Sequence, residues 1–227
     1  MRILTRMNSG LIKGRSKGHT GMNESQLKAF FGIDLSIRNT GICFIPPEWD
    51  KKPDSLICKN VIIDEKDVTG IGYERRLLGI SEQINSFIKD CIGCRNIDIH
   101  VALEEYAYSR RSRSSSSLAE IGGVVRSMIW RDFKVSTHLV GSGTARKNLM
   151  GKTRRKRRDD AAKGIKPLPI KSQVKKFLKN RSFFVKGWNN DVIDAFVVAY
   201  WKYCQVFRGS NFFEPSFESE LIMRRKK

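Results

Sequence analysis

Several carboxylates of this chain lie inside its most apolar segments, and this placement limits the folds in which the chain can bury a core. Asp34 interrupts the strand-like stretch FFGIDLS, Glu104 ends the apolar run of NIDIHVALEEY, and Asp191 and Asp194 open NNDVIDAFVVAYW. Ionised carboxylates in an apolar setting cost several kcal/mol each unless cations neutralise them. We therefore expect a fold in which these acids meet a shared positive charge.

Asp34 is the hardest of these acids to explain as an ordinary surface residue. The apolar residues Phe31, Ile33 and Leu35 alternate along the predicted strand, so Asp34 lies with Gly32 on the opposite face. If Asp34 had no functional role, that face would have to be half-exposed to water.

The other acids each have a plain structural alternative. Asp191 could simply favour a helix N-terminus, Asp194 could lie on the surface, and Glu104 with Glu105 could mark a strand that leaves the core. The joint pattern is harder to dismiss, because Asp191 and Asp194 are three residues apart and share a helix face. These segments contain no Lys or Arg, so a bound divalent metal is a better source of the neutralising positive charge than a basic side chain. Carboxylate oxygens suit Mg²⁺ or Mn²⁺ rather than zinc.

The chain is strongly basic, which indicates a polyanionic partner. Its 227 residues carry 43 Lys and Arg against 23 Asp and Glu, a formal charge of +20 at pH 7. Nucleic acid is the first candidate for that partner. We expect a polar loop at about 142–169 to contact DNA, with a solvated linker or a localisation signal as the alternative. The side chains expected to contact phosphates there and just beyond are Arg146, Lys147, Lys152, Arg154, Arg155, Lys156, Arg157, Arg158, Lys171 and Lys175.

A second basic strip, YAYSRRSRSSSS, follows Glu104. Aromatic rings beside Arg can stack on unpaired bases, which makes this strip a second candidate DNA contact. The alternative is that its two tyrosines belong to the core. The residues concerned are Tyr106, Tyr108, Arg110, Arg111 and Arg113.

The order of the predicted elements indicates one α/β domain. Three antiparallel strands followed by alternating helices and strands make a mixed five-stranded sheet flanked by helices. We expect this domain to span residues 28–210, between a flexible basic arm at 1–27 and a tail at 211–227. The elements are strands at 30–36, 40–47, 58–65, 96–106 and 135–141, and helices at 73–91, 114–133, 171–180 and 189–204.

The cysteines and the lack of long apolar runs bear on the compartment. Five cysteines, Cys43, Cys58, Cys91, Cys94 and Cys204, are an odd number in apolar segments, so we expect packed thiols in a reducing compartment rather than disulfides. Cys91 and Cys94 lack the second pair that a zinc site needs. No run approaches the roughly 20 apolar residues of a membrane span. We expect a soluble, intracellular protein of a bacterial host cytoplasm, with mitochondrial import as the alternative.

Four blocks of the sequence together resemble the RuvC-like Holliday junction resolvases of the RNase H-like superfamily, especially those carried by bacteriophages. The blocks are FFGIDLSIRNTG, VALEEYAY, AEIGGVVR and NNDVIDAFVVAYW, and the similarity covers roughly residues 30–205. The resemblance implies an RNase H-like fold and a DNA endonuclease of recombination and repair. Its catalytic residues would be Asp34, Glu104, Asp191 and Asp194, which would hold two Mg²⁺ or Mn²⁺ ions. Glu104 rather than Glu105 matches the family pattern of two apolar residues before the glutamate.

The resemblance also implies a substrate and an assembly. The substrate would be four-way and other branched DNA, cut to leave 5′-phosphate and 3′-hydroxyl ends. The enzyme would be a homodimer that packs around the helix with Gly122 and Gly123, although these glycines could instead let the helix approach the sheet. Ala107 replaces the phenylalanine that bacterial members insert at the junction centre. A neighbouring tyrosine takes that role, or branched DNA is recognised less strictly.

Two other functions fit the same residues. The first keeps the fold but changes the substrate, as in a nuclease for RNA:DNA hybrids or a transposase-type nuclease. The second is a non-catalytic, architectural DNA-binding protein, which the presence of all four acids disfavours.

Overall fold

The structure is a computed structural model that describes residues 26–50, 52–62, 72–105, 114–150, 169–181 and 186–208. Its strands are β1 (Lys28–Asp34), β2 (Asn39–Ile45), β3 (Ile57–Ile62), β4 (Asp98–Glu104) and β5 (Thr137–Val140). Its helices are α1 (Tyr73–Ile92), α2 (Ser114–Phe133), α3 (Ser142–Met150), α5 (Ile170–Asn180) and α6 (Asn190–Arg208), with a short 3-10 helix at Pro53–Ser55. None of the helices in these ranges is both long and apolar enough to cross a membrane.

The five strands form one mixed sheet in the order β3-β2-β1-β4-β5. β2 runs antiparallel to β1 and β3, whereas β4 runs parallel to β1 and β5. This topology confirms the predicted fold class. Because β1 and β4 are parallel neighbours, with Ile33 opposite Leu103, their C-terminal ends lie at the same edge of the sheet. Asp34 and Glu104, which end these two strands, are therefore brought close together.

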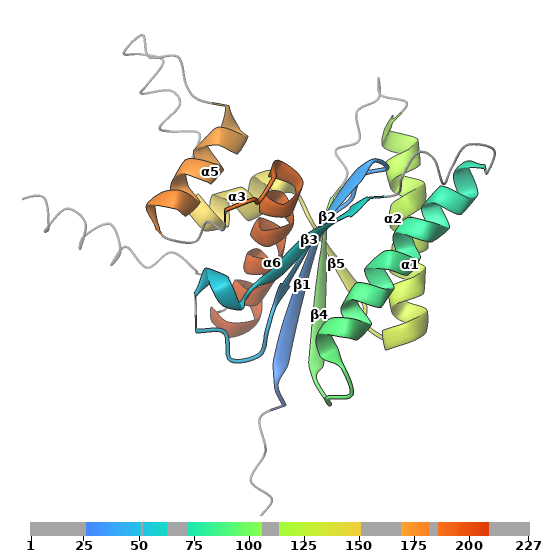
Figure 1. Ribbon diagram of the computed structural model, residues 1–227, viewed down its shortest axis with the longest axis horizontal. Helices are drawn as coiled ribbons and strands as arrows, with labels where there is room; N and C mark the ends of the chain where they lie inside the picture. Colours follow the sequence, from blue (N-terminus) through green and yellow to red (C-terminus); the bar gives the residue numbers. More distant parts are fainter. Residues whose placement is uncertain are drawn as a thin grey trace, which may run out of the picture.

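Helices cover both faces of the sheet, and successive strand residues alternate between two cores. Figure 1 shows α1 and α2 on one face and α6, with α3 and α5 beyond it, on the other. Phe31 and Ile33 pack in the core beneath α1 and α2. Phe30 and Ala102 pack in the core beneath α6. The face that carries Asp34 is thus covered by a helix, so the half-exposed face that an ordinary surface role for Asp34 would require is absent.

Two glycines let α6 lie directly on the central strands. A Cβ atom at Gly32 would overlap the backbone of Ala195 and Ala199, and one at Gly41 would overlap the backbone of Asp191. Residues Val192 to Ala199 are all buried, because the sheet covers one side of the helix and α3 and α5 cover others. The apolar composition of α6 follows from this position, as does the placement of its acids above β1.

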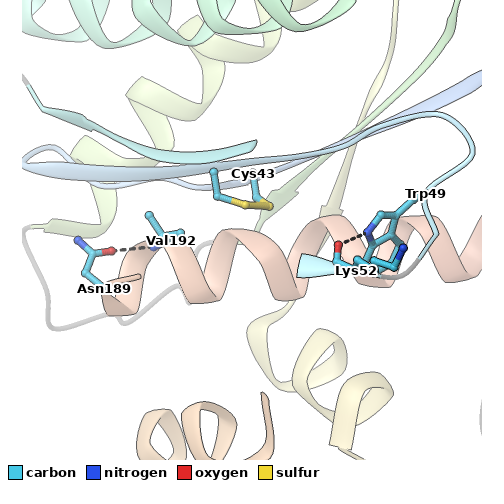
Figure 2. Close-up of a disulfide and its surroundings, with 6 residues drawn as sticks. Cys43, Trp49, Lys52, Asn189 and Val192 are labelled. Atoms are coloured by element: carbon cyan, nitrogen blue, oxygen red, sulfur yellow. Dashed lines mark hydrogen bonds between the residues drawn. A yellow bond between two sulfur atoms is a disulfide. The ribbon is translucent and has the colours of Figure 1, made fainter. Parts of the chain in front are cut away.

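A side-chain cap sets where α6 begins. Asn189 Oδ1 accepts a hydrogen bond of 3.0 Å from the backbone N–H of Val192, as Figure 2 shows. The carbonyl of Asn189 also accepts a bond of 3.1 Å from the N–H of Ile193. Such caps satisfy backbone donors that the first turn leaves free. The cap places Asp191 in the first turn and Asp194 one turn later.

A disulfide joins Cys43 of β2 to Cys58 of β3 on the sheet face that looks toward α6 (Figure 2). The prediction of packed thiols is therefore wrong for these two residues, whereas Cys91, Cys94 and Cys204 take no part in this disulfide. Sequence spacing could not reveal the pair, because the two cysteines become opposite each other only through the β2–β3 register. The bond ties the edge strand β3 to its neighbour.

The predicted loop at about 142–169 begins with a helix. Residues 142–150 form α3, because Ala145 and Leu149, four residues apart, bury one side of it against α6. The rest of that predicted loop, the arm before residue 26 and the predicted tail lie outside the described residues. So do the following candidate DNA contacts: Tyr106, Tyr108, Arg110, Arg111, Arg113, Lys152, Arg154, Arg155, Lys156, Arg157 and Arg158.

Candidate metal centre

Three carboxylates from three elements meet at the C-terminal edge of the central strands. Asp34 of β1, Glu104 of β4 and Asp194 of α6 can each offer an oxygen such that all three oxygens lie within 4.8 Å of one another. Asp194 is 3% exposed, and the other two are partly buried. Three hard oxygen ligands at this spacing fit a divalent cation such as Mg²⁺ or Mn²⁺.

The other acids of the predicted site lie differently. Asp191 is one turn before Asp194 on α6, partly buried, and is not part of the three-oxygen group. Glu105 is exposed and lies beyond the end of β4. The structure therefore brings together three of the four predicted ligands, and it places Glu105 outside this group.

Three of the acids, Asp34, Glu104 and Asp191, have a raised pKa in the folded protein. Burial, followed by the charges of Glu104 and Asp194, raises the pKa of Asp34 from 3.8 to about 8. Burial and the charge of Asp194 also raise the pKa of Glu104, although Arg146 and a hydrogen bond from Ser142 oppose the shift. Burial raises the pKa of Asp191 as well. A bound cation would remove this repulsion, so the donor set fits a metal.

Two basic side chains reach Asp194 from segments that are far away in the sequence. Arg146 of α3 places Nη2 at 2.9 Å and Nε at 3.3 Å from Oδ1. Lys171 of α5 places Nζ at 3.0 Å from Oδ2. From the sequence, both residues are candidate DNA contacts, and the acidic segments themselves contain no Lys or Arg. No local pattern could reveal these ion pairs, since α3 and α5 meet α6 only in the folded chain.

Two more of the predicted DNA-binding residues lie on these helices. Lys147 follows Arg146 on α3 and is exposed, and Lys175 is one turn beyond Lys171 on α5 and is partly exposed. α5 is held in place through Val174 and Leu178, which are buried in the core beneath α6. Arg146 and Lys171 thus contact the acidic centre, and Lys147 and Lys175 lie on the same two helices.

Metal binding should depend steeply on pH. Because the pKa of Asp34 is about 8 without a metal, its carboxyl is mostly protonated at lower pH, and a metal must displace that proton. We expect the apparent affinity for Mn²⁺ to rise by about tenfold per pH unit between roughly pH 6 and 8, and to level off above. Electron paramagnetic resonance of free Mn²⁺ measures this affinity. If the affinity for Mn²⁺ did not change between roughly pH 6 and 8, Asp34 would already be ionised without the metal.

The mixed sheet in this strand order, with an acid ending each central strand and a helix laying further acids above them, defines the RNase H-like fold. Solved structures of RuvC from Thermus thermophilus share it. The complex of that protein with a Holliday junction substrate superposes with a TM-score of 0.57 at 15% identity, covering 81% of this chain and 97% of that one.

A second structure of Thermus thermophilus RuvC gives a TM-score of 0.56 at 15% identity, and covers 80% of this chain and 97% of that one. No protein-family model matches the sequence, and no curated protein matches it in sequence. At this level of identity, the similarity establishes the fold alone.

Proposed function

We propose that this protein is a metal-dependent endonuclease that cuts four-way and other branched DNA. The observation that carries the proposal is the convergence of Asp34, Glu104 and Asp194 on an RNase H-like fold. The fold is shared with RuvC structures, one of which contains a Holliday junction substrate. The formal charge of +20 gives such a nuclease its attraction to DNA.

In this function the three converging carboxylates, with Asp191 beside them, hold the metal ions. Two ions between these ligands would supply the water nucleophile and stabilise the leaving 3′ oxygen, which yields 5′-phosphate and 3′-hydroxyl ends. Asp34 and Glu104 are fixed by the sheet, and Asp194 is fixed by Arg146, so the ligands need little rearrangement. The metals, the products and the role of Asp191 are part of the proposal.

The DNA backbone would approach along the basic side chains of α3 and α5. Lys147 and Lys175, on the helices that carry Arg146 and Lys171, would neutralise phosphates beside the scissile one. The basic residues outside the described ranges, with Tyr106 and Tyr108, would extend this contact to the branch. Phosphate contacts set the position of the strand, whereas selection of branched DNA requires the shape of the whole junction.

The experiment that tests this function compares labelled substrates side by side. They are a four-way junction, a matched linear duplex, a flap and an RNA:DNA hybrid, each with Mg²⁺, Mn²⁺ or EDTA. Symmetric, ligatable nicks in the junction that require metal would support the proposal, and equal cutting of flaps would widen it to branched DNA. Preferential cutting of the hybrid would replace it with another nuclease function. Tight binding without any cutting would favour an architectural role.

Two symmetric cuts in one junction need two active sites, and we propose that the α1–α2 face provides a homodimer contact. A groove of about 600 Å³ lies between these helices, which cover the face of the sheet opposite α6 (Figure 1). Gly123 in its floor has nothing within 4 Å of where a Cβ would lie, so a second helix can approach closely. Glu120 and Arg131 line the groove at opposite ends of one α2 face.

Charge reversal tests this contact. If two copies of α2 pack antiparallel, Glu120 of each copy faces Arg131 of the other. Glu120→Arg should therefore weaken dimerisation by roughly tenfold, because it sets like charges together, and the double variant Glu120→Arg/Arg131→Glu should restore it. Analytical ultracentrifugation over a range of concentrations measures the change. An unaltered dimer in the single variant would place the contact elsewhere.

A further inference from the structure

Asp194 differs from the other acids of the centre because both of its carboxylate oxygens are already paired. Arg146 Nη2 lies 2.9 Å from Oδ1, and Lys171 Nζ lies 3.0 Å from Oδ2. Among the described residues, neither Asp34 nor Glu104 forms an ion pair. A cation bound by the three acids needs an oxygen of Asp194, and in this structure both oxygens face a positive charge.

The two cations are not equally free to leave. The side chain of Arg146 is 14% exposed, and it holds Oδ1 with two nitrogens from a helix packed against α6. The side chain of Lys171 is 46% exposed and makes a single contact of 3.0 Å from the first turn of α5. Lysine carries a flexible four-carbon stem, so its ammonium group can move to another anion while the helix stays in place.

We propose that Lys171 occupies a metal-ligand position in the DNA-free protein and gives it up to the metal when a DNA phosphate arrives. This inference rests on the proposed nuclease function. The phosphate to be cut must lie beside the three acids, within reach of a side chain that already contacts one of them. Lys171 then exchanges one anion for another, and Oδ2 of Asp194 becomes available to the metal.

The exchange makes DNA and metal bind cooperatively. Each partner favours the state in which Lys171 has left Asp194, so each raises the affinity for the other by the same factor. Without DNA, Lys171 competes with the metal, and the centre is poorly loaded. With DNA, the same positive charge helps to hold the substrate.

Binding of Mn²⁺ to the DNA-free protein tests the first half of the proposal. Lys171→Met, which keeps much of the apolar stem, should bind Mn²⁺ about tenfold more tightly than the unmodified protein. Lys171→Arg keeps the charge and should not. Lys176→Ala removes one charge from an exposed position of the same helix and should also leave the affinity unchanged. The resonance signal of free Mn²⁺ gives the dissociation constants, and circular dichroism shows that each variant is folded.

Binding in the presence of DNA tests the second half. A four-way junction that already carries the two nicks serves as the DNA, so that no cleavage occurs during the titration. It should raise the Mn²⁺ affinity of the unmodified protein by about tenfold and that of Lys171→Met much less. A folded Lys171→Met protein that binds Mn²⁺ no more tightly than the unmodified one would overturn the proposal, as would an equal effect of DNA on both.

Asp34→Asn separates this failure from failure of the nuclease assignment. If that variant binds Mn²⁺ as well as the unmodified protein, the three acids are not the metal centre, and the proposed function falls with them. If it loses Mn²⁺ binding while Lys171→Met shows no gain, the metal centre stands and only the exchange at Lys171 is wrong.

Discussion

Asp34→Asn is expected to reduce metal-dependent cleavage of junction DNA by roughly 10³-fold or more while leaving junction binding intact. The substitution keeps the size of the side chain but removes a charged ligand from the centre of the three-oxygen group. Cleavage time courses under saturating metal measure the loss. Electrophoretic mobility shifts in EDTA measure binding, which depends on basic residues that the substitution does not touch.

The same variant should be more stable than the unmodified protein in the absence of metal. Burial raises the pKa of Asp34 in the folded chain to about 8, against 3.8 for the ordinary group. Its ionised form is therefore destabilising, and this cost grows as the pH rises from about 4 to 8. Asn carries no charge and avoids the cost. Urea unfolding at pH 8 in EDTA should show a higher midpoint for the variant.

Glu105→Gln is the matched control for the loss of cleavage expected in Asp34→Asn. Glu105 lies only one residue beyond Glu104, but it is exposed and does not belong to the three-oxygen group. Glu105→Gln therefore removes one carboxylate charge next to the ligand Glu104 but outside the three-oxygen group. Equal losses of cleavage in both variants, or a full rate in Asp34→Asn, would contradict the assignment of the centre.

Gly32→Ala is expected to destabilise the fold by about 3 kcal/mol and to impair metal binding even in the protein that remains folded. The added methyl group would overlap the backbone of Ala195 and Ala199, which cannot rotate away as a side chain could. α6 must then move off β1 and carry Asp194 away from Asp34. Urea unfolding and Mn²⁺ titration measure the two effects.

Gly143→Ala provides the comparison, because nothing lies within 4 Å of a Cβ at that position of α3. It should leave the stability unchanged or raise it by up to about 1 kcal/mol, as expected for alanine replacing glycine in a helix. If Gly32→Ala proved as stable as Gly143→Ala, close contact between α6 and β1 would not be what positions the centre.

The sheet and the identity of the acids were accessible from local patterns. Alternating apolar residues predicted the strands, and the change to helical spacing predicted the crossover helices, so the mixed topology followed. Asp34 and Asp194 stood out because charge is costly in apolar segments wherever they fold. These features depend on residues that are close together in the sequence, which is why the pattern was sufficient.

Features that depend on contacts between distant segments were missed. Residues 142–150 form a helix where a loop was expected, because Ala145 and Leu149 are buried against α6. Cys43 and Cys58 are paired only by the register of β2 and β3. The close approach of α6 to the face around Gly32 likewise depends on a contact between distant segments. Local propensity is too weak to override such packing. Local propensity also contains no information about which distant segments will pack together.

The charges around the acids also depend partly on local sequence and partly on contacts between distant segments. The sequence was enough to establish that buried carboxylates need cations and that the chain is basic enough to attract DNA. It could not establish that Arg146 and Lys171 meet the two oxygens of Asp194. Ion pairing depends on distances of a few ångströms between side chains, and only the packing of α3 and α5 against α6 sets those distances.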